Sequence, residues 1–229
     1  MGSTRLVGRL RRVTARRADG ERGAASLFEV LTTLALLSIV MVVVYEGIVS
    51  MGSALEGGTE RLVNLDEGRT LMAVATKDVR TATRLSAGTS PFVLAEKREI
   101  TFYGNLNPIV GTAGPRKIHM YVDSSTQLIE EVQAPDAGSA PNYTYNGPKT
   151  IRFVGRYVAN PVNRPIFRYY DENRNELTNV PLSAADSLAV HSVRIELAIK
   201  RSQAYNVNYT TLVNQVRLPN VDYAAAQGG

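Results

Sequence analysis

One stretch of this sequence constrains the fold more than any other. Between Val30 and Tyr45 no residue carries a charge, and Glu29 is the only charged residue among positions 25–45. At 1.5 Å per residue, a helix over these positions is roughly 31 Å long, which matches the hydrocarbon core of a bilayer. The sequence therefore predicts a membrane-spanning or export helix near the N-terminus.

The residues before this stretch are strongly basic. Positions 1–24 carry a net charge of +5, which equals the net charge of the whole chain. The remaining residues are balanced, which argues against direct nucleic-acid binding, because such binding relies on basic groups that neutralise phosphates. A basic flank instead sets the orientation of a membrane helix, since its positive side stays in the cytoplasm. We expect residues 1–24 to be an unstructured basic leader peptide.

The residue types that carry catalysis are scarce. The chain has no cysteine, which excludes a disulfide framework and a thiolate metal site. His119 and His191 fall on the polar phase of expected strands, and we interpret both as solvent-facing. No Ser-His-Asp order, pair of catalytic carboxylates or Gly-rich phosphate loop is evident. We therefore expect no enzymatic activity and no cofactor.

A helical pattern returns after the apolar stretch. Gly57-Gly58 should loosen or kink a continuing helix. From about Glu60 to Leu85 apolar residues recur on one face, and Gly88 and Pro91 should end the helix. The apolar face, which predicts packing against a globular head, consists of Leu65, Met72, Ala75, Val79 and Ala82; the polar face carries Asp66, Arg69, Lys77, Arg80 and Arg84.

Short segments rich in β-branched and aromatic residues alternate with turn residues after Pro91. This pattern of short segments and turns is typical of antiparallel sheets. Residues 191–200 alternate most clearly between apolar and polar positions. The letters "DSST" predict a hairpin turn, and Ser183 with Asp186 predicts a capped helical turn. The expected strands are 92–95, 99–103, 117–123, 127–133, 150–158, 166–170, 191–200 and 210–218.

The junction between the leader and the helix has a distinctive order. It reads "GAASLFE" from Gly23 to Glu29, so a basic leader is followed by small residues, a short uncharged stretch, a glutamate and the apolar run. This order resembles the class III signal of type IV prepilins and type II secretion pseudopilins. In that family a membrane peptidase, the prepilin peptidase, cuts on the cytoplasmic side and methylates the new N-terminus, and the glutamate is the fifth mature residue.

The resemblance implies where this chain is processed. Counting back from Glu29 puts the cut between Ala24 and Ala25, with N-methylation of Ala25. The family prefers glycine before the cut, so cleavage between Gly23 and Ala24 is the alternative. A carboxylate in a membrane bundle is costly unless it is neutralised. The resemblance implies that Glu29 pairs with the N-terminal ammonium of a neighbouring subunit, which exists only after cleavage.

The head supports a narrower resemblance. The phrases "TKDVRTAT", "ITFYGNLN" and "IHMYVDSSTQLIEEV" follow one another as in the minor pilin and pseudopilin group that includes PilW, ComGF and the J-type pseudopilins. A minor type IV pilin at or near the tip of a pilus, which primes assembly, is implied. Its partners would be the prepilin peptidase, other pilins through the N-terminal helix, and the inner-membrane assembly platform.

The same resemblance implies a route through the bacterial cytoplasmic membrane. The chain would cross it once, with the N-terminus in the cytoplasm and the head outside, and would then reach the cell surface in the pilus. One alternative is a pseudopilin of a type II secretion or DNA-uptake piston. Another is a membrane-anchored surface binding module or enzyme, which could be cut by signal peptidase after Ala54.

The sequence therefore predicts an α+β, pilin-like protein. Its expected parts are a basic leader over 1–24, a transmembrane and filament-core helix over 25–59, an amphipathic helix over 60–90, an antiparallel β-rich head over 91–223 and a disordered tail over 224–229.

Three weaker patterns lie in the head. Asp171, Asn173 and Asn175 alternate like the ligands of a calcium loop, but Glu176 stands where such a loop requires glycine, so a turn is the simpler interpretation. Asn142 and Asn208 each begin an N-x-T glycosylation triplet, a pattern that is common by chance.

Overall fold

The computed structural model describes residues 7–106, 114–201 and 209–221, with side chains along the first helix described from Ser26 onward except for Glu56. The chain divides into two compact units, Met1–Glu56 and Gly57–Gly229. The described part of the first unit is helical; the second contains the last turns of that helix and all of the described strands, and is called the head below.

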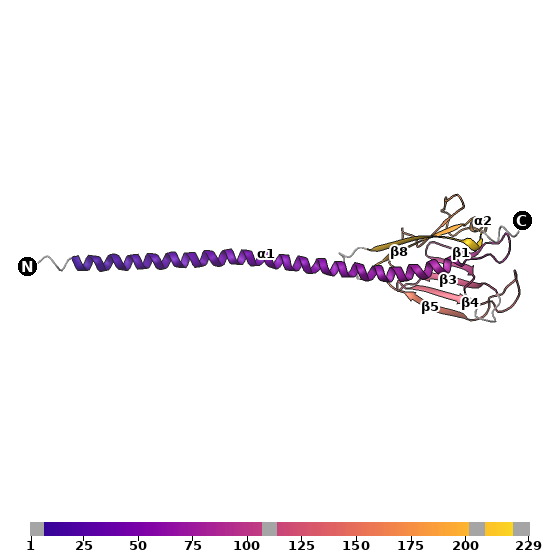
Figure 1. The fold of residues 1–229 in the computed structure, drawn as a ribbon, viewed down its shortest axis with the longest axis horizontal. Coiled ribbons are helices and arrows are strands. Elements are labelled where there is room, and N and C mark those ends of the chain that lie inside the picture. The colour runs from indigo at the N-terminus through magenta and orange to yellow at the C-terminus, as the bar shows by residue number, and fades with distance from the viewer. Residues whose placement is uncertain (1–6, 107–113, 202–208, 222–229) are drawn as a thin grey trace, which may run out of the picture. The chain divides into compact units, whose positions relative to one another are not determined.

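Helix α1 (Val7–Arg80) is longer than the sequence predicts (Figure 1). The expectation of an unstructured leader is wrong for residues 7–24, whose backbone is helical; arginine and alanine, which are good helix formers, are frequent there. The helix also continues through Gly57-Gly58, because each glycine costs only about 1 kcal/mol and strong helix formers flank the pair.

The same helix ends earlier than expected. The stretch 60–90 is not a separate helix: its first part completes α1, which stops at Arg80. The backbone N–H of Thr83 donates to the carbonyl of Tyr103 and that of Asn105 donates to the carbonyl of Thr81, so the chain after α1 pairs with a strand. This pairing takes the backbone groups that a continuing helix would need.

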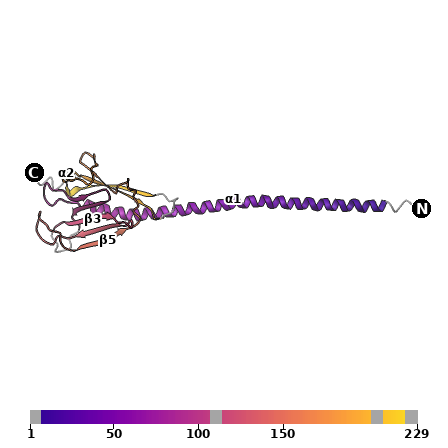
Figure 2. The same cartoon turned by 180° about the vertical axis from the view of Figure 1, so that it is seen from behind.

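The described strands are antiparallel, as the sequence predicts, and they form two sheets (Figures 1 and 2). The predicted strands are confirmed to within a few residues at their ends; β7, only two residues long, was not predicted. The first sheet has the order β1-β2-β3-β4-β5, and the second β7-β6-β8-β9. The bounds are β1 Phe92–Ala95, β2 Glu99–Gly104, β3 Arg116–Val122, β4 Leu128–Gln133, β5 Lys149–Gly155, β6 Phe167–Tyr170, β7 Glu176–Leu177, β8 Ser192–Ile199 and β9 Thr210–Arg217.

Both predicted turn motifs are confirmed. The Asp123 carboxylate accepts from the backbone N–H groups of Ser125 (2.9 Å) and Gln127 (2.8 Å), which closes the hairpin between β3 and β4. The short helix α2 (Ala184–Leu188) begins at Ser183, whose hydroxyl oxygen accepts from the N–H of Asp186 at 3.1 Å.

The last turns of α1 supply the centre of the head core, between the two sheets (Figure 2). A Cβ atom added to Gly68 would lie 2.4 Å from Leu212 of β9, and one added to Gly155 of β5 would lie 2.6 Å from Leu71. The helix therefore packs closely on both sheets. Of the predicted apolar face, Leu65 is half-buried and the other four members are buried, while Leu71 is fully buried and was not predicted.

We expect Leu71→Ala to lower the free energy of unfolding of the head by about 2–5 kcal/mol, because it opens a cavity where two sheets and a helix meet. Leu62→Ala, on the same helix, should change it by no more than about 0.5 kcal/mol, because Leu62 is 69% exposed. Urea unfolding of the full chain in detergent, followed by tyrosine fluorescence, measures both; equal losses would contradict this packing.

Candidate functional site

The first unit exposes an apolar surface with nothing packed on it. Between Leu27 and Leu55 every large apolar side chain has half or more of its surface exposed. The segment Ser26–Arg80 is the one described helix long and apolar enough to cross a membrane. A soluble helix usually buries such a face, and an open apolar face of this length is typical of a helix surrounded by lipid or by other helices.

Glu29 lies in this surface with its side chain exposed. Its carbonyl oxygen accepts hydrogen bonds from the hydroxyls of Thr32 (2.9 Å) and Thr33 (2.6 Å), and Ser38 donates in the same way to Ala35. These hydroxyls are satisfied within the helix and suit an apolar medium. The Glu29 carboxylate is then the one charged group among the described side chains from Ser26 to Tyr45.

The expected processing positions Gly23, Ala24 and Ala25 belong to the backbone of α1. Their side chains lie outside the described part, and a helical backbone does not distinguish a cut after Ala24 from a cut after Gly23. Both alternatives stay predictions.

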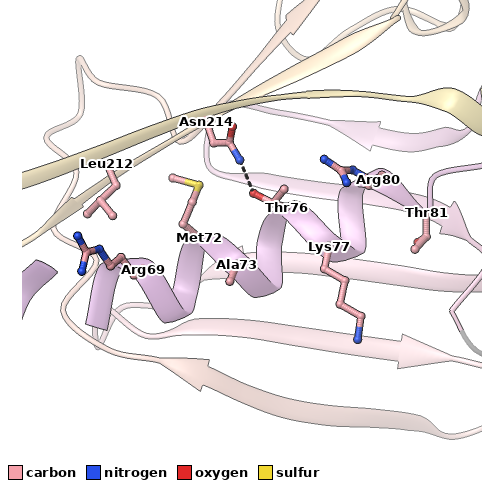
Figure 3. Close-up of a pocket in the computed structure, with 9 residues that line it drawn as sticks. All are labelled: Arg69, Met72, Ala73, Thr76, Lys77, Arg80, Thr81, Leu212 and Asn214. Atoms are coloured by element: carbon pink, nitrogen blue, oxygen red, sulfur yellow. Dashed lines mark hydrogen bonds between the residues drawn. The ribbon is translucent and has the colours of Figure 1, made fainter. Parts of the chain in front are cut away.

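A groove of about 610 Å³ lies between α1 and the edge strand β9 (Figure 3). Met72 and Leu212 give it apolar walls, and the Asn214 side-chain amide donates to the Thr76 hydroxyl at 3.0 Å. No described carboxylate forms an ion pair with the three cations that line it. The lining residues are Arg69, Met72, Ala73, Thr76, Lys77, Arg80, Thr81, Leu212 and Asn214.

Two buried carboxyl groups meet where α1 contacts the first sheet. The side chains of Asp78 and Glu130 are 3% and 2% exposed, and Arg152 of β5 contacts both, at 3.2 Å from Asp78 Oδ2. The sequence analysis did not identify this cluster. The sequence did contain an indication of it. Asp78 adjoins the apolar face of its helix, and Glu130 lies two residues from both Leu128 and Val132, so all three point to the same face of the strand.

The protonation of this pair couples the head to pH. Burial, the charge of Glu130 and a hydrogen bond between the two carboxyl groups raise the pKa of Asp78 to about 7, although Arg152 acts in the opposite direction. In the folded head, Asp78 thus keeps its proton up to about pH 7, whereas in the unfolded chain it loses the proton near its ordinary pKa of 3.8. The resulting stabilisation is complete below about pH 4 and is lost as the pH rises through about 7.

We expect Asp78→Asn to flatten this pH dependence of the unfolding free energy, because the amide does not titrate. Urea unfolding at a series of pH values between about 4 and 8 measures the slope. Asp66→Asn is the matched control on the exposed face of the same helix and should keep the slope of the original chain. A slope unchanged by Asp78→Asn would show that another group causes it.

The outer face of the first sheet carries a second polar network. His119 Nε2 lies 3.0 Å from Glu99 and its Nδ1 lies 3.5 Å from Glu131, while Lys149 Nζ lies 2.7 Å from Glu131. The prediction that His119 is solvent-facing is therefore wrong in part: it is half-buried in this network and stacks on Tyr121 at 4.7 Å between ring centroids.

The remaining predicted features have simple structural explanations. His191 is half-buried and precedes β8 instead of lying on a strand. The Asp171 carboxylate accepts hydrogen bonds from the backbone N–H of Asn175 at 2.7 Å and from the Asn175 side-chain amide at 3.0 Å. The segment that contains Asp171, Asn173 and Asn175 is therefore a turn held by its own hydrogen bonds. Asn142 is exposed, and Asn208 lies outside the described residues.

Comparison with known proteins adds no family to this description. No protein-family model matches the chain, and no curated protein shows significant sequence similarity to it.

Proposed function

We propose that this chain is a minor type IV pilin. In this proposal the prepilin peptidase cuts after Ala24, the apolar part of α1 holds the chain in the bacterial cytoplasmic membrane, and the subunit then joins a pilus at or near its tip to prime assembly. The observation that carries the proposal is the uncovered apolar helix with one carboxylate near its start, followed by an antiparallel β head.

The helix fits two successive environments. Its open apolar side chains suit lipid before assembly and a bundle of neighbouring helices afterwards, and neither provides water for a free charge. The Glu29 carboxylate therefore requires a cation in the bundle. A new N-terminal ammonium on the neighbouring subunit would supply one, so cleavage would act as the switch for assembly.

In the same proposal the head forms contacts and catalyses no reaction. Strands β5 and β9 lie at the ends of their sheets, and Ile151 and Phe153 of β5 are 65% and 46% exposed. Open strand edges and exposed apolar side chains are typical of surfaces that partner proteins cover.

The first test of this proposal is the mature N-terminus. We expect mass spectrometry of the chain purified from its own cells to show the loss of residues 1–24 and a methylated Ala25. An N-terminus at Ala24 would select the alternative cut. An intact leader, or a chain that begins after Ala54, would overturn the proposal.

The second test concerns Glu29. We expect Glu29→Gln to leave cleavage intact and to reduce incorporation into sheared filaments by tenfold or more, because the amide cannot neutralise an ammonium. Ser38→Ala, which removes only a hydroxyl bonded within the helix, should assemble normally. Incorporation of Glu29→Gln at the level of the original chain would remove the assigned role of this carboxylate.

A further inference from the structure

The head has two long strand edges that are open. Strands β5 and β9 each lie at the end of a sheet, and among the described residues no backbone group of Thr150–Phe153 or Thr211–Gln215 bonds outside its own sheet. The other two end strands offer less, because β7 is two residues long and the carbonyl of Ala95 in β1 accepts from the N–H of Leu182. Open edges of this length are templates for a further strand.

Strand β5 runs in the direction opposite to α1. Arg152 lies 3.2 Å from Asp78, and farther along the strand a Cβ atom added to Gly155 would lie 2.6 Å from Leu71. The positions that β5 meets on the helix therefore fall in number as the strand proceeds.

Strand β9 runs in the same direction as α1. A Cβ atom added to Gly68 would lie 2.4 Å from Leu212, and farther along the strand the Asn214 side-chain amide donates to the Thr76 hydroxyl at 3.0 Å (Figure 3). The positions met on the helix rise with the strand. Within one head, the open edges of β5 and β9 are thus antiparallel to each other.

We propose that β5 of one copy pairs with β9 of a second copy, which joins a sheet of one head to a sheet of the other in a continuous antiparallel ladder. The inference rests on the proposed function, because copies anchored in one membrane enter their heads from the same side, at Gly57, and so have the last turns of α1 parallel. It names the partner edge that the proposed function leaves open.

Strand direction excludes the pairing of like edges. An antiparallel ladder between two β5 strands, or between two β9 strands, turns one head end for end and sets the last turns of α1 in opposite directions. A parallel ladder between like strands requires a half turn about the strand axis, which places the outer face of one sheet beside the inner face of the other. Only β5 against β9 keeps the helices parallel, the ladder antiparallel and the outer faces continuous.

The outer faces of both edge strands carry exposed apolar side chains. Arg152 and Leu212 face α1, so Ile151 and Val213, their neighbours in sequence, lie on the outer faces. These two residues are 65% and 48% exposed. Setting Ile151 directly opposite Val213 covers both with a β-branched cross-strand pair, the kind that stabilises a sheet.

The alternative registers are less favourable. A slip of two residues in one direction sets Lys149 opposite Arg217, and like charges directly opposite each other destabilise a ladder. A slip in the other direction carries Phe153 past the start of β9 at Thr210. A slip of one residue turns the outer face of one strand to the inner side.

The contact is small and joins two different edges. Five residue pairs fall below the roughly 1,200 Å² of a stable interface between free proteins, so the pairing depends on anchoring, which raises the effective concentration of the heads. One β5 and one β9 are used in each contact. A pair of copies therefore keeps one open edge of each kind, to which a further subunit can add.

Cysteine cross-linking tests the pairing, because the chain has no natural cysteine. An Ile151→Cys chain and a Val213→Cys chain, each with its own tag, are produced together in the cells of origin, and the membrane fraction is exposed to a mild oxidant. We expect a disulfide-linked species that carries both tags, since directly opposite residues of an antiparallel ladder lie within disulfide reach.

The matched control replaces Val213→Cys by Val93→Cys, a valine on β1 that is also 48% exposed. This pair, and Ile151→Cys in both chains, should each give about tenfold less linked species, because neither brings the two sulfur atoms together. Linked species at the level of the first pair in either control would show random collision or pairing of like edges, and would overturn the inference.

A second set of positions tests the register. Phe153→Cys with Thr211→Cys should also link, whereas Phe153→Cys with Val213→Cys should give several-fold less, because diagonal neighbours are about 7–8 Å apart. The opposite order of yields would overturn the assigned register.

The N-terminus of the same samples separates this inference from the proposed function. A chain processed at Ala25 that gives no linked species would overturn the pairing and leave the proposed function standing. A linked species from a chain with an intact leader would retain the pairing and overturn the proposed function. An unprocessed chain without linked species would overturn both.

Discussion

The burial of the last turns of α1 between two antiparallel sheets is the interaction on which the head depends. Leu71, Ala75 and Val79 are almost wholly buried, and the inner residues of both sheets gather around them. A sheet with one apolar face cannot bury that face by itself and needs another element packed on it. Close approach at Gly68 and Gly155 allows one helix to contact both sheets, since a side chain at either position would collide with a leucine.

The same helix has a different requirement outside the head. In the first unit the large apolar side chains lie open, so this part obtains its stability from whatever surrounds it, whether lipid or other helices. A helix of this kind needs an apolar environment around it, either lipid or protein. This is the physical basis for proposing an assembly function, and it gives the Glu29 carboxylate, the three cations of the groove and the open strand edges a common interpretation as surfaces for neighbours.

Much of the fold could be predicted because each pattern had a local physical cause. Alternation placed the strands, since successive side chains of a strand point to opposite faces, and the Asp123 and Ser183 motifs satisfy backbone groups within a few residues of themselves. The helix bounds were predicted less well. The order over residues 7–24 and through Gly57-Gly58 reflects strong helix formers nearby, and the end at Arg80 reflects pairing of the next residues with β2.

The amino-acid sequence by itself determined the apolar stretch with its single charge at Glu29, the amphipathic pattern after residue 60 and the antiparallel strands, because composition and period act along one segment at a time. Only the tertiary structure decided which segments meet. It brought Asp78, Glu130 and Arg152 together from a helix and two strands, and it set β9 beside α1 so that three cations line one groove. The residues that meet from different elements are between about 20 and 140 positions apart in the chain. No local pattern encodes which distant partner neutralises a buried charge.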